Sequence, residues 1–198
     1  MINRLKNWVS DNPDLAFAIL LSVCVYSYFA VTSEFFATHR TAFAIMERFA
    51  VLGLVGLALT LCIIAGEIDL SIGSNAALSA VITVRFTDSL GAVNALLIAL
   101  AVSTIIGIIQ GYFIAYLRVR AIVLTVGTLM LLRGVALFAA EEKTVMLTDF
   151  RVPDFISTKM LWYFSPASLL VIAMFVVVGL FMSYTRYGRE IYAIGGAR

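Results

Sequence analysis

Six long runs of apolar residues constrain the fold of this 198-residue chain more than any other feature. They cover residues 15–31, 49–65, 70–86, 91–117, 121–140 and 166–184. A helix needs about 20 apolar residues, and at least about 17, to cross the hydrocarbon core of a bilayer. Only 13% of the residues are charged, against roughly a quarter in soluble domains. We therefore predict an all-α fold, a polytopic membrane helix bundle with about six transmembrane helices in a single domain over residues 1–198.

Residues 65–80, with the sequence AGEIDLSIGSNAALSA, interrupt this apolar pattern. Gly66 suits the left-handed turn that often follows a helix, and Glu67 and Asp69 lie between the second and third runs. Non-helical backbone at membrane depth is tolerated only where protein shields it or where it lines a water-filled cavity. We expect a broken or re-entrant helix junction near residues 66–70, in a protected or hydrated environment.

Small polar residues follow this break at helical spacing. With about 3.6 residues per turn they share one helix face, and they are Ser71, Ser74, Asn75, Ser79 and Thr83. Such a face either packs against a neighbouring helix or lines a hydrated path for a polar solute. Asp69 either caps the third helix at its N-terminus, contacts a solute or a gate, or pairs with another helix.

The fourth and fifth runs carry further candidates. Small residues spaced four apart in the fourth run predict close helix packing; they are Ser103, Gly107, Gly111 and Ala115. Gln110 beside them either bonds to another helix or contacts a solute. Arg133 interrupts the fifth run. A charge inside a span is a functional candidate, although an arginine near a helix end also extends to the interface or forms a structural ion pair.

Several function classes find no support in the sequence. The formal net charge of +2 gives no basis for nucleic-acid binding. His39 is the only histidine and has no partner at metal-ligand spacing. The strings GxSxG, HExxH and Walker A are missing. We therefore expect no enzyme activity, no metal site and no cofactor in this chain, so that any energy for transport comes from a partner or a gradient.

The basic residues of the loops predict the orientation. With the N-terminus in the cytoplasm, the cytoplasmic side holds the larger set, which is Arg4, Lys6, Arg118, Arg120, Arg186, Arg189 and Arg198. The opposite side holds Arg40, Arg85, Lys143, Arg151 and Lys159. The positive-inside rule favours this arrangement. It places residues 141–165 outside as one long loop, ending in the interfacial aromatics Trp162, Tyr163 and Phe164.

Three ordered strings carry a family resemblance. They are GEIDLSIGS with NAALSAV at residues 66–81, QGYFIAYLRVRAIVLTVGTLMLLRG at 110–134 and TRYGREIYAIGG at 185–196. The chain resembles the membrane permease subunits of bacterial ABC importers for ribose, xylose, galactose and related small molecules. It departs from the family pattern at Glu67, Gln110, Arg120, Ala121 and Ala197, where Glu67 adds a negative charge at the break.

The resemblance implies an ATP-driven, binding-protein-dependent importer of sugars or related polar solutes in the bacterial inner membrane. Implied partners are a second permease subunit in a homo- or heterodimer, cytoplasmic ATPase subunits that bind ATP and Mg²⁺, a periplasmic solute-binding protein and the lipid membrane. The implied coupling helix and later spans are missing, so we expect the N-terminal three-fifths of a permease. The expected translocation path comprises Glu67, Asp69, Ser71, Ser74, Asn75, Ser79 and Gln110.

Two other classes remain open at this stage. A gradient-driven secondary transporter or channel would use Glu67 and Asp69 to bind an ion near the broken helix. A membrane-embedded enzyme is disfavoured, because the sequence offers no combination of nucleophile, base and orienting group. The sequence does not name the transported solute.

Overall fold

The structure is a computed structural model that describes residues 10–141, 151–160 and 163–196. Its helices in these ranges, in chain order, are α2 (Pro13–Thr32), α3 (His39–Ile64), α4 (Ile72–Leu90), α5 (Ala92–Ala115), α6 (Ala121–Ala139), α7 (Arg151–Ser157), α8 (Pro166–Tyr184) and α9 (Arg186–Gly196). The predicted all-α fold is confirmed. Five residues that entered the predictions of orientation and interface lie outside the described residues: Arg4, Lys6, Lys143, Trp162 and Arg198.

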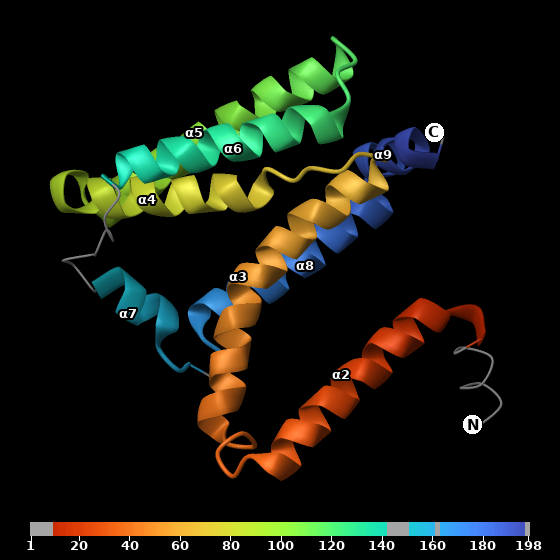
Figure 1. The fold of residues 1–198 in the computed structure, drawn as a ribbon, viewed down its shortest axis with the longest axis vertical. Helices are drawn as coiled ribbons and strands as arrows, with labels where there is room; N and C mark the ends of the chain where they lie inside the picture. Colours follow the sequence, from red (N-terminus) through yellow and green to blue (C-terminus); the bar gives the residue numbers. More distant parts are fainter. Residues whose placement is uncertain (1–9, 142–150, 161–162, 197–198) are drawn as a thin grey trace.

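The helices form two packed groups joined by the break (Figure 1). In the first group α4 packs against both α5 and α6, and in the second α3 packs against α8, whose end is followed by α9. Leu78, Leu132 and Ala136 form a buried core between α4 and α6, with Val102 and Ile106 of α5 packed against it. Helix α2 lies apart from both groups and buries none of its residues.

Five of the described helices are long and apolar enough to cross a membrane: α2, α3, α5, α6 and α8. Helix α4 has a similar length of 19 residues, but its polar stripe, Arg85 and Asp88 lower its hydropathy. The polytopic helix bundle is therefore confirmed, with five such helices in the described ranges against the six predicted. Large apolar side chains cover the outside of the bundle, as at Phe17 and Phe138, which are 66% and 85% exposed.

Helix α3 begins at His39 rather than near residue 49, where the apolar run begins. The Thr38 hydroxyl accepts the Thr41 N–H at 3.3 Å and so caps the helix. Glu47 and Arg48 therefore lie within α3. The capping threonine, rather than the first apolar residue, sets the start of this helix.

The segment expected as one long loop contains a helix, α7, and ends in a cap for α8. The Ser165 hydroxyl accepts the Ser168 N–H, and the Ser168 hydroxyl accepts the Ser165 N–H at 2.9 Å. This capping box is followed at once by Pro166 in the first turn of α8. Tyr163 of the expected aromatic belt stacks on His39, with ring centroids 5.1 Å apart.

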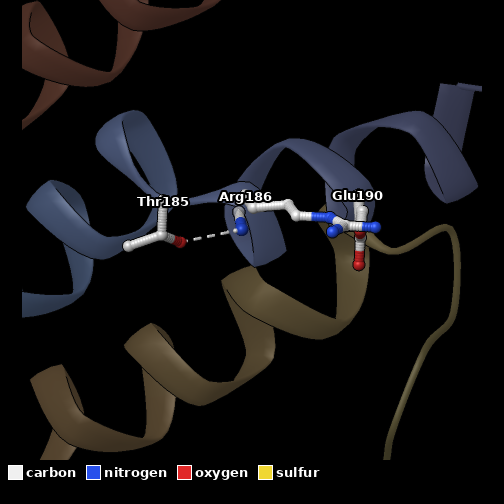
Figure 2. A network of polar contacts seen from close by, with 4 residues as sticks. Thr185, Arg186 and Glu190 are labelled. Atoms are coloured by element: carbon white, nitrogen blue, oxygen red, sulfur yellow. Dashed lines mark hydrogen bonds and ion pairs between the residues drawn. The ribbon is translucent and has the colours of Figure 1, made fainter.

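The chain turns sharply between α8 and α9, and side chains fix the start of α9 (Figure 2). The Thr185 hydroxyl accepts the Gly188 N–H at 3.1 Å, which caps α9. Arg186 donates from Nε to Glu190 Oε1 at 2.8 Å, one helical turn away. Because both of these side chains are largely exposed, the ion pair adds little stability. Helix α9 also contacts α3.

Candidate functional site

The break between α3 and α4 is built around Gly66. Helix α3 ends at Ile64, and Gly66 has φ of +80°. The Gly66 N–H donates to Ile63 O at 2.9 Å and the Glu67 N–H donates to Cys62 O at 3.0 Å. These two bonds form a Schellman motif, which needs a left-handed residue after the helix. The predicted junction is present, and non-helical backbone spans residues 65–71.

A hydrogen-bond network that is buried at Ser71 and Gln110 fixes the far side of the break. Asp69 Oδ1 accepts the Ser71 N–H at 2.8 Å and the Ser71 hydroxyl at 2.7 Å. Gln110 of α5 donates from Nε2 to Ser71 Oγ at 2.9 Å. Ser71 is only 1% exposed and Gln110 8%. The network therefore ties the backbone of the break to α5.

Of the three roles left open for Asp69, capping of α4 is not the one observed. Ser71 occupies the N-cap position, and no side chain accepts a capping hydrogen bond there. Asp69 lies two residues earlier and bonds to Ser71 in an Asx turn. The carboxylate thus orders the extended segment that leads into the helix rather than the first turn of the helix.

Thr125 of α6 supports the same segment and was missed in the sequence. Its side chain is fully buried, and its hydroxyl lies 3.5 Å from Ile68 O and 3.4 Å from Ile122 O. A hydroxyl within an apolar run is the signal that was available, but the sequence does not say which carbonyl it faces. The break is therefore held from both α5 and α6.

The polar stripe of α4 divides between two neighbours. Ser79 Oγ lies 2.6 Å from Ser103 Oγ of α5 and donates to Asn75 O at 2.8 Å. With the Ser71–Gln110 bond, this makes α4–α5 a polar interface. The Asn75 Oδ1 atom is buried and has no hydrogen-bond partner in the part of the chain that the structure describes. Thr83 bonds back to Ser79 O within its own helix.

Removing the hydroxyl pair between α4 and α5 tests this interface. In a double-mutant cycle of Ser79→Ala and Ser103→Ala we expect a coupling free energy of about 0.6 kcal/mol, the average for such bonds in membranes. The measurement is unfolding of the purified protein in mixed micelles. Thr104→Ala is the control, because the Thr104 hydroxyl donates to Leu100 O within its own helix. Zero coupling would show that the two hydroxyls are not bonded to each other.

Ser74 lies on another side of α4 from the serine pair. It lines a groove of about 570 Å³ between α4 and α6, together with Gly73, Ala77, Leu129 and Arg133. Arg133 is exposed and makes no hydrogen bond or ion pair with the described residues. The groove thus combines a hydroxyl, a guanidinium and apolar walls. Such a surface can hold a polar solute by hydrogen bonds.

Glu67 lines a separate hollow on the other side of the break, with Arg118 and Arg120 of the α5–α6 turn. The seven residues of the expected path therefore fall on separate surfaces. Asp69, Ser71 and Gln110 form one hydrogen-bond network, and Ser79 faces α5 with Asn75 one helical turn before it. Ser74 faces the groove and Glu67 faces the hollow. Their role in transport stays a prediction.

Within the described residues, the small residues of α5 contact other helices only in part. Ser103 contacts α4 through Ser79. A Cβ at Gly107 or Gly111 would meet no atom within 4 Å, and Ala115 is exposed. The close packing predicted for these positions therefore stays a prediction for a helix outside the described residues. The described residues as a whole contain no group of three or more His, Cys, Asp or Glu side chains that could hold a metal ion.

Known proteins match most of the chain. The family described as branched-chain amino acid transport system / permease component matches residues 41–198. The inner membrane ABC transporter permease protein YjfF of Escherichia coli (strain K12) is 30% identical over 194 residues, covering 92% of this chain and 57% of YjfF. The autoinducer 2 import system permease protein LsrC of Yersinia pseudotuberculosis serotype O:3 (strain YPIII) is 28% identical over 181 residues, covering 90% of this chain and 51% of LsrC.

The chain thus spans between half and three-fifths of the length of these curated relatives. No solved structure gives a significant match to it.

Proposed function

Because the chain belongs to the branched-chain amino acid transport system / permease component family, we propose that it is part of the membrane permease of an ATP-driven importer for a small polar solute. The observation that carries this proposal is the match over residues 41–198, which contains the break, its buried network and the α4–α6 groove. Several apolar helices of spanning length agree with a multi-pass protein of the inner membrane.

The proposed partners follow from this role. ATP and Mg²⁺ bind to cytoplasmic ATPase subunits, a periplasmic protein delivers the solute, and a second permease subunit completes the path. The open face of α5 at Gly107 and Gly111 gives a surface that a neighbouring helix can approach closely. The N-terminus lies in the cytoplasm in this proposal, as does the α5–α6 turn.

The proposed solute is small and rich in hydroxyl groups. YjfF and LsrC are named as permeases, and LsrC belongs to an import system for autoinducer 2. The groove of α4 and α6 offers Ser74 and Arg133 beside apolar walls. Hydroxyl and guanidinium groups bond to sugar-like hydroxyls, whereas the small side chains Gly73 and Ala77 leave room for the solute. The proposed solute path therefore follows the groove.

Uptake in vesicles tests the proposed function. The permease from the complete coding sequence is reconstituted with its ATPase and binding protein, and uptake of labelled sugars is followed. We expect uptake only when ATP is on the side of the membrane that carries the ATPase and the binding protein is on the opposite side. Uptake that continues without ATP and stops when an ion gradient is removed would instead establish a secondary transporter.

Filling the groove should block transport without preventing insertion. We expect Ser74→Trp to remove more than half of the ATP-driven uptake, because an indole occupies the space beside Arg133. The control is Val176→Trp, which adds the same ring at an exposed site of α8 and should leave uptake near the wild-type rate. Wild-type uptake by the Ser74 variant, at equal amounts in the membrane, would exclude the groove from the path.

A further inference from the structure

A second hollow lies between the break and the α5–α6 turn, away from the α4–α6 groove. It has a volume of about 690 Å³. Its walls come from Gly66–Ile68, from Ile114 and Ala115 at the end of α5, and from residues 118–123. Arg118, Arg120 and Glu67 are its charged residues, and most of the others are apolar. The hollow is thus amphipathic.

Its position places it at a membrane boundary. Helix α5 ends at Ala115 and α6 begins at Ala121, and both are long and apolar enough to span a bilayer. The short turn between two such helices lies where hydrocarbon gives way to lipid headgroups. The apolar side chains of the hollow, Ile114, Ile122 and Val123, therefore lie at the depth of the first acyl carbons, beneath the two arginines.

The two arginines are available to a ligand. Both are exposed, and neither makes a hydrogen bond or ion pair with a residue that the structure describes. Arg118 has φ of +53°, a conformation that favours glycine. The Val119 N–H donates to Phe113 O at 3.2 Å and closes the turn around it. An arginine thus occupies a position where glycine would relieve backbone strain.

The charges of the hollow select the class of ligand. Arg118 and Arg120 bring two guanidinium groups to the hollow, which Glu67 also lines. A guanidinium binds phosphate oxygens in a planar, two-bond geometry. A lipid phosphodiester therefore fits this hollow, because its phosphate meets the arginines while its lipid tail would cover the apolar wall.

We propose that this hollow binds the headgroup of an anionic phospholipid, with Arg118 and Arg120 on the phosphodiester and the apolar wall against the glycerol and the first methylene groups. Basic pockets at the ends of membrane helices bind such lipids. The lipid would fix the α5–α6 turn next to the break. This role does not depend on which solute is transported.

Lipid titration tests the proposal on the purified protein from the complete coding sequence. Phosphatidylglycerol is added to delipidated protein in detergent, and bound lipid is counted by native mass spectrometry. We expect Arg118→Gln/Arg120→Gln to weaken binding by about fivefold per arginine, roughly 25-fold in all. Ile122→Trp, which keeps both charges and fills the hollow, should also lower binding. Glutamine leaves the backbone at residue 118 as strained as before, so these variants do not change the turn.

The control removes the same number of positive charges nearby, although one of them is paired with Glu190. Arg186→Gln/Arg189→Gln alters two exposed arginines of α9, which packs against the end of α3 beside the break. This variant should bind phosphatidylglycerol within about twofold of the wild type. An equal loss in both double variants would overturn the proposal in favour of general surface attraction.

Two further measurements distinguish a lipid phosphate from a free phosphate. Phosphatidylethanolamine, which has no net charge, should bind more weakly than phosphatidylglycerol, and inorganic phosphate should not displace the lipid. Equal binding of the two lipids would overturn the requirement for an anionic headgroup. Displacement by inorganic phosphate at millimolar concentration would show that the hollow is a site for a free anion instead.

Discussion

Gly195→Ala is expected to lower the stability of the protein by about 1–3 kcal/mol, the usual range for overpacking. A Cβ at Gly195 would overlap the backbone carbonyl oxygen of Ile64. Backbone at the end of α3 cannot rotate away as a side chain can, so α9 must move. Replacing glycine by alanine within a helix normally stabilises the helix by about 1 kcal/mol. A loss of stability in the Gly195→Ala variant would therefore be opposite in sign to the usual effect.

The neighbouring residue supplies the control. Gly196 is also at the end of α9, but a Cβ there would meet no atom within 4 Å, so Gly196→Ala should be neutral or slightly stabilising. The measurement is thermal unfolding in detergent, combined with trypsin cleavage at Arg189, which should become faster only in the Gly195 variant. Equal behaviour of the two variants would show that α9 does not pack on α3 as described.

The same contact connects α9 with the proposed function. Ile64 precedes Ala65 and Gly66, so a shift of α9 acts directly on the break. Gly188 makes a similarly close approach to the Met182 carbonyl at the start of α9. Two glycines thus hold this helix between the ends of α8 and α3. In the proposed importer, motion of α9 would reach the break through backbone contact, and the Gly195 variant should also lose ATP-driven uptake.

The helices and the break could be predicted because their causes are local. Bilayer thickness fixes the length of an apolar run, and α6 and α8 lie almost as predicted, at Ala121–Ala139 and Pro166–Tyr184. Gly66 marks the end of α3 because its conformation of φ +80° suits glycine. These features need no knowledge of which helix lies next to which.

The rest depends on tertiary contacts. The period of 3.6 groups Ser71, Ser74 and Ser79 on one face, but it does not tell which neighbour covers each part of that face. In the structure Ser79 meets α5 while Ser74 faces α6. The close approaches at Gly188 and Gly195 follow from how helix ends meet, although the GG string was visible. Thr125 could not be assigned because its acceptor lies 57 residues away in sequence.

Asp69→Ala is expected to lower the free energy of unfolding by about 1.5–3 kcal/mol, the range for hydrogen bonds to charged groups. One oxygen, Oδ1, accepts both hydrogen bonds from Ser71. Without it the Ser71 N–H and hydroxyl lose their acceptor in a buried site, and Gln110 loses a fixed partner. Asp69→Asn keeps an acceptor oxygen of the same shape and should lose less than half as much stability.

The comparison of these two variants separates a structural role of Asp69 from a role in transport. If Asp69 acts through Ser71, uptake should follow stability, so that the asparagine variant transports well and the alanine variant poorly. Ser71→Ala should then add little to the loss of stability caused by Asp69→Ala, because the effects of substitutions at contacting residues of one network are not additive. If both variants unfold like the wild type but neither transports, the charge itself is required, and Asp69 contacts the solute or a gate rather than only the backbone of the break.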